Sequence, residues 1–177
     1  MKKFTLILVL AFVFTAISCE GDRGPQGPQG PPGFDGGIER GTVLEITGDF
    51  TAQNAYAFGF EFPTTVEVFE SDVVQVYLLE EVIDDPSGPV DVWTPLDTSF
   101  FFEDGSQLVY NYNHTFFDVQ FFLGGNVDFG TVSNDLLLNQ TFRIAIIPAD
   151  FAENNPDLNS MEAIMQAMPN VEVIGLN

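Results

Sequence analysis

The stretch "LVYNYNHTFFDVQFFL", residues 108–123, contains two runs in which every second side chain is large and apolar. In the first run, Asn111 and Asn113 stand between these apolar positions. In the second run, Val119, Phe121 and Leu123 take every second position. Because successive side chains of a β-strand point to opposite faces, this alternation predicts two strands, each with one buried face.

The same period of two recurs on both sides of this stretch. It appears in "YAFGFEF" at 56–62 and in "FRIAII" at 142–147. Turn sequences separate the runs, and the Asp104-Gly105 pair is the strongest hairpin signal among them. About eight strands without intervening helices predict an all-β fold, either a sandwich or a barrel, and we expect an antiparallel β-sandwich. It forms a single head domain over residues 38–177.

One short helix is expected near the C-terminus, in "SMEAIMQAM" at 160–168. Asn159 can cap this helix, Glu162 follows three residues later, and Pro169 ends the pattern.

The first 18 residues read as a signal peptide. Lys2 and Lys3 precede an apolar run that is shorter than the roughly 20 residues a membrane-spanning helix needs. The run ends in "AISC", which resembles the lipobox of bacterial lipoproteins, with Cys19 as the lipidated first residue of the mature chain. Cys19 is the only cysteine and has no partner for an internal disulfide. An ordinary secretory signal with a chance cysteine is the alternative.

Residues 19–37, "CEGDRGPQGPQGPPGFDGG", form a collagen-like stalk. Glycine occupies every third position from Gly21 to Gly36, and Glu39 breaks the register. The triplets are too few for a stable triple helix alone, so we expect an extended spacer of roughly 50 Å at about 3.1 Å per residue. A homotrimer is the alternative, if lipid anchors and head domains bring three chains together.

The lipobox followed at once by "GPQGPQGPPG" resembles the collagen-like-repeat lipoproteins of the Bacteroidetes, which are of uncharacterised function. This resemblance implies a location in the cell envelope, lipid-anchored to a bacterial membrane, and we expect the outer membrane. It leaves open which side of that membrane the head faces, and it implies no catalytic residue.

The charge of the chain excludes several classes of function. The net charge is −21, and after the signal peptide only Arg23, Arg40 and Arg143 are basic. Nucleic acid would be repelled, and both a P-loop lysine and a Schiff-base lysine are absent. The single histidine, His114, lies in the apolar register of its run, where we expect a packed residue. We therefore expect no enzyme.

Calcium is the one metal whose ligands the sequence offers. Asp150, Glu153 and Asp157 lie in an oxygen-rich stretch that leads into the expected helix. Their spacing fits no EF-hand, and a polar loop with a helix cap is the favoured interpretation.

Three aromatic residues are candidates for a partner surface. In the strand register, Phe116 and Phe122 fall on the side of Asp118 and Gln120. Trp93 alternates with Val92 and lies between Asp91 and Pro95. Outward rings indicate either a contact with a protein or a flat ligand platform, although a strongly twisted sheet would cover them locally. The leading hypothesis is a non-catalytic interaction or structural module anchored to the membrane. The alternative is a carbohydrate-binding module that uses exposed aromatics such as Trp93.

Overall fold

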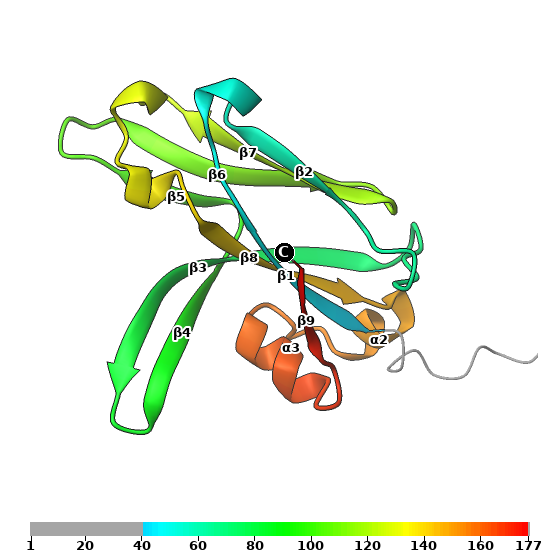
Figure 1. Cartoon of the computed structure of the whole chain (residues 1–177). Coiled ribbons are helices and arrows are strands. Elements are labelled where there is room, and N and C mark those ends of the chain that lie inside the picture. The colour runs from blue at the N-terminus through cyan, green and yellow to red at the C-terminus, as the bar shows by residue number, and fades with distance from the viewer. Residues whose placement is uncertain (1–40, 177) are drawn as a thin grey trace, which may run out of the picture. The chain divides into compact units, whose positions relative to one another are not determined.

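A computed structural model describes residues 41–176. The predicted signal peptide, Cys19 and the collagen-like stalk lie outside the described residues. The described part is a β-sandwich of two sheets, with two short α-helices packed on the outer face of one sheet (Figure 1). The prediction of an all-β sandwich is confirmed. Residues 41–176 form nine strands where about eight were expected, and two α-helices where one was expected.

The larger sheet has five strands in the order β4-β3-β8-β1-β9. These strands are β1 (Thr42–Gly48), β3 (Val73–Asp85), β4 (Gly88–Pro95), β8 (Gln140–Ile147) and β9 (Val173–Leu176). Neighbouring strands are antiparallel except β1 and β9, which run parallel. The expected antiparallel arrangement therefore holds for every strand pair in residues 41–176 except this one at the sheet edge. The helices between β8 and β9 carry the chain across the sheet, so β9 enters beside β1 in the same direction.

The smaller sheet has four antiparallel strands in the order β2-β7-β6-β5. They are β2 (Ala57–Glu61), β5 (Thr98–Phe101), β6 (Gln107–His114) and β7 (Asp118–Gly125). The hairpin predicted at Asp104-Gly105 joins β5 to β6, and Gly105 has a φ of +83° that suits glycine.

The main core lies between the two sheets and consists of the side chains that the alternating patterns predicted to point inward. Phe142, Ile144 and Ile146 of β8 face the other sheet and are almost fully buried. Across from them, the Phe121 ring lies 4.5 Å from Phe142 and 5.0 Å from Phe58, measured between ring centroids. Burial of this apolar surface is the main force that holds the two sheets together.

A second core joins the other face of the five-stranded sheet to helices α2 (Ala149–Asn154) and α3 (Met161–Ala167). Ser160, one residue after the expected Asn159, caps α3, since its Oγ accepts a hydrogen bond from the Ala163 N–H at 3.1 Å. Within the described chain, neither α-helix is long and apolar enough to span a bilayer. Because both helices pack on the larger sheet, no helix of residues 41–176 covers the outer face of the smaller sheet.

Strands β3 and β4 extend beyond the rest of their sheet as a hairpin arm (Figure 1). Residues 73–78 of β3 pair with β8, whereas β3 beyond residue 78 pairs with β4 alone. A bulge between Leu79 and Glu81 shifts the register of this second pairing. The Ser87 N–H and hydroxyl both bond the Asp85 carboxylate at the turn, and these bonds lower the pKa of Asp85.

Candidate functional site

Trp93 lies on β4, on the side of the sheet that carries the helices. Its ring is half-buried, and the Arg143 guanidinium lies over it at 4.0 Å from the ring centroid. Arg143 is held there by Glu45, whose Oε2 accepts a bond from Nε at 2.9 Å, and by Asp91 at 3.8 Å. The indole nitrogen is buried with no hydrogen-bond partner in the described chain. The ring is therefore less open than the sequence predicted, because β8 places a cation on it.

Phe116 lies in the turn between β6 and β7, not on the face with Gln120 as the sequence predicted. Strand β7 begins only at Asp118, whose carbonyl accepts a bond from the Thr115 N–H at 2.9 Å. The alternation therefore does not extend back to Phe116. Its ring lies 3.9 Å from that of Phe117, which is 67% exposed.

His114 is at the end of β6 and is exposed, so the expectation of a packed histidine is wrong. The ring lies parallel to Tyr112, with 6.2 Å between centroids.

Asp150, Glu153 and Asp157 are all exposed, and the first two lie on α2, where the sequence predicts a polar loop. Among residues 41–176, no three Asp, Glu, His or Cys side chains come together as a metal site requires. Calcium binding at these residues stays a prediction.

Phe122 does lie on the outer side of its strand, as predicted. It stands opposite Ala57 of β2 and Asn111 of β6, and it is half-buried. One row along, Gln120 stands opposite Gly59 and Asn113 in the same way. The ring is thus surrounded by very small side chains and by amides.

We call this outer surface of the four-stranded sheet the amide face. Its members, assigned by strand register, are Ala57, Gly59, Ser99, Phe101, Val109, Asn111, Asn113, Gln120, Phe122 and Gly124. These residues are uncharged. By the same register, Glu61 and Asp118 point to the same side of the sheet, where they stand opposite each other at one end. In a chain of net charge −21, they are the only charged side chains on this side of the four strands.

A hollow of about 430 Å³ opens on the amide face beside Phe122. Gly59 forms part of its lining, together with Asn113 and Gln120. A Cβ atom at Gly59 would meet the Gln120 Cγ at 3.7 Å, an ordinary van der Waals contact. Packing does not require glycine here, although glycine weakens a strand, and its effect is to leave the hollow open.

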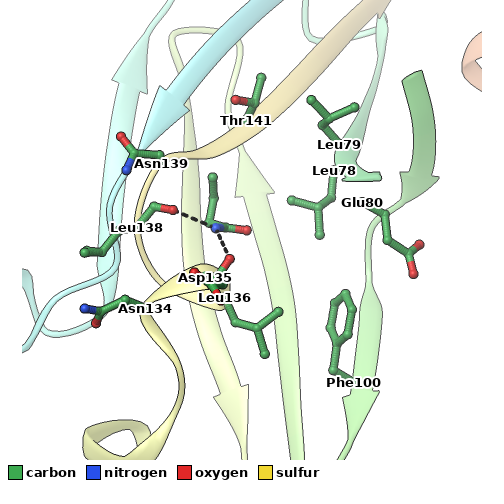
Figure 2. Close-up of a pocket in the computed structure, with 11 residues that line it drawn as sticks. Leu78, Leu79, Glu80, Phe100, Asn134, Asp135, Leu136, Leu138, Asn139 and Thr141 are labelled. Carbon is green, nitrogen blue, oxygen red and sulfur yellow. Dashed lines mark hydrogen bonds between the residues drawn. The ribbon is translucent and has the colours of Figure 1, made fainter. Parts of the chain in front are cut away.

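A second cavity, of about 480 Å³, lies between the β3 bulge, Phe100 and the segment from Asn134 to Thr141 (Figure 2). One of its amides, that of Gln140, is already used, because Nε2 donates to the Asp135 and Leu138 carbonyls at 2.9 and 2.8 Å. The Glu80 carboxylate accepts a bond from the Thr94 hydroxyl. The side chains of Asn134, Asp135 and Asn139 form no hydrogen bond within residues 41–176, so this cavity also offers polar groups. Unlike the hollow beside Phe122, it has carboxylates in its lining, those of Glu80 and Asp135.

The strongest pKa shifts belong to tyrosines that stabilise the fold. Burial, with the neighbouring Tyr112 as a smaller cause, raises the pKa of Tyr77 to about 12. Burial also raises the pKa values of Tyr110 and Tyr112, whose hydroxyls donate to the carbonyls of Leu136 and Val74. These phenols stay neutral at physiological pH and act in packing.

Comparison of the chain with known protein families, with curated proteins and with solved structures finds no match.

Proposed function

We propose that this protein is a lipid-anchored cell-envelope protein whose head is a non-catalytic binding module, with the amide face as its binding surface. The observation that carries this proposal is the low charge of one sheet face in a strongly acidic domain, where carboxylates occur only at the end formed by Glu61 and Asp118.

The composition of the amide face supports a role in recognition. Interface centres are typically depleted of charged residues and enriched in aromatic ones. Phe101 is 76% exposed, and Phe122 adds a second, half-buried ring. Large exposed rings cost free energy in water, so a face that keeps two of them is suited to a partner.

Anchoring through Cys19 and spacing by the stalk would hold this face at a distance from the membrane. Two or more acyl chains on one cysteine hold a protein firmly, whereas a single chain binds weakly. If the stalk joined three chains, a homotrimer would present three amide faces, and weak individual contacts would add through avidity.

The test uses a soluble form of the protein that lacks the signal peptide and carries Cys19→Ser. It measures how much of this protein is retained on envelope fractions of the producing bacterium. Gln120→Glu places a carboxylate on the amide face at almost unchanged size and should reduce retention severalfold. Asn170→Asp makes the same chemical change beyond α3 and serves as the matched control. Equal retention of the two variants would contradict the proposal.

A further inference from the structure

We infer that the ligand of the amide face is an uncharged glycan chain. This inference rests on the proposed function and deepens it, since it names the chemical class of the partner. It is carried by the chemistry around Phe122, by the free amides beside it and by the hollow that Gly59 leaves open.

The surroundings of Phe122 allow a flat ligand to lie against its ring. Its cross-strand neighbour on β2 is Ala57, and Gly59 and Gly124 are close on the same face. The face of an aromatic ring is electron-rich, and the C–H bonds on one side of a sugar ring are weakly positive. Because Ala57 and Gly59 are the neighbours on the β2 side, a sugar can approach the ring across the sheet from that side.

The amides beside the ring can recognise hydroxyl groups. The side chains of Asn113 and Gln120 form no hydrogen bond with other residues in the range 41–176, and both are exposed. Asn111 uses one N–H on the Val109 carbonyl at 3.2 Å, which leaves its oxygen and second N–H. An amide donates and accepts, as a sugar hydroxyl does, whereas an ionised carboxylate only accepts.

The charge distribution selects an uncharged ligand. An acidic glycan would be repelled by a chain of net charge −21. A basic ligand would find carboxylates on the amide face only at its edge, at Glu61 and Asp118. The polar amides of Asn111, Asn113 and Gln120 next to Phe122 suit the hydroxyl groups of a glycan better than the apolar surface of a protein partner.

The position of the second ring indicates a chain and not a single sugar. Phe101 on β5 lies two strands from Phe122 on β7. On the strand between them, β6, Phe101 stands opposite Gln107 and Phe122 stands opposite Asn111, four residues further along. With strands about 4.8 Å apart and a rise of about 3.4 Å per residue, the two rings are roughly 17 Å apart. A ligand that contacts both rings must therefore contain several sugar units.

The test is calorimetric titration of the mature lipidated protein in micelles of a detergent without a sugar headgroup. The probes are the neutral hexasaccharides of β-1,4-glucose, β-1,4-mannose and β-1,4-xylose, with hexagalacturonate as the acidic counterpart. At least one neutral probe should bind, and hexagalacturonate should not.

Two variants and one control assign this binding to the amide face. Phe122→Leu keeps an apolar side chain but loses the ring and should weaken binding at least about tenfold. Asn113→Ala combined with Gln120→Ala should do the same. Phe117→Leu removes an exposed ring from the β6–β7 turn and should leave the affinity unchanged.

Failure of all three neutral probes to bind, tighter binding of hexagalacturonate, or equal affinities for Phe122→Leu and Phe117→Leu would overturn the inference. If these probes failed but retention on envelope fractions still depended on Gln120, the head would still be a binding module, and only the proposed class of ligand would be wrong. If retention also did not depend on Gln120, the proposed function itself would be wrong.

Discussion

Phe121 and Phe122 are adjacent in β7, and the structure places their rings on opposite faces of the sheet. Phe121 is fully buried in the main core, with ring contacts to Phe142 and Phe58. Phe122 is half-buried on the amide face. Replacing each of them with alanine deletes the same atoms from the same strand, so the difference between the variants reports the face on which each ring lies.

The expected losses in the free energy of unfolding differ severalfold. A buried phenylalanine replaced by alanine costs about 3–5 kcal/mol, and the two ring contacts of Phe121 place it in the upper part of that range, at about 4 kcal/mol. Only part of the Phe122 surface is buried, so replacing it with alanine should lower the free energy of unfolding by about 1 kcal/mol. Domains of this kind are stable by about 5–15 kcal/mol, so Phe121→Ala removes much of the total.

Urea unfolding followed by circular dichroism and by the fluorescence of Trp93, the only tryptophan, measures both losses. A slip of one residue in the register of β7 would exchange the two faces. Equal costs for the two variants, or a larger cost for Phe122→Ala, would refute the assignment of the amide face.

Three further outcomes are expected. Cys19→Ser should release the protein from the membrane fraction, and mass spectrometry should find lipid on the native N-terminal peptide; retention without lipid would contradict the anchor. Gly48→Ala should cost about 1–3 kcal/mol, because its Cβ would lie 2.3 Å from the Phe58 ring, whereas Gly59→Ala should be tolerated. The free energy of unfolding should fall as the pH rises from 10 to about 12, because the pKa of Tyr77 is about 12 when folded and 10 when unfolded. A flat profile in urea titrations across this range would argue against a buried phenol.

The sheets could be predicted from the sequence because their signals are local. Alternation along "FRIAII" identifies the inward side chains of β8, since burial of one face imposes a period of two. Asp104-Gly105 identifies a hairpin because the turn needs a residue that accepts positive φ.

The amide face could not be predicted because it depends on contacts between distant strands. The sequence shows that Asn111 and Asn113 oppose the apolar residues of their own strand. It does not show that Gln120 and Gly59 stand in the same row, which follows from the strand order β2-β7-β6-β5. The sequence likewise does not show that Arg143 of β8 lies over the ring of Trp93 on β4, because these strands come together only in the folded sheet.

The most direct test of the central claim is an NMR titration of the side-chain amide signals with the neutral hexasaccharide that binds best. The account predicts shifts for Asn111, Asn113 and Gln120 that saturate together, with Asn170 unchanged. Shifts confined to Gln140 and the cavity in Figure 2, with the amide face silent, would contradict it.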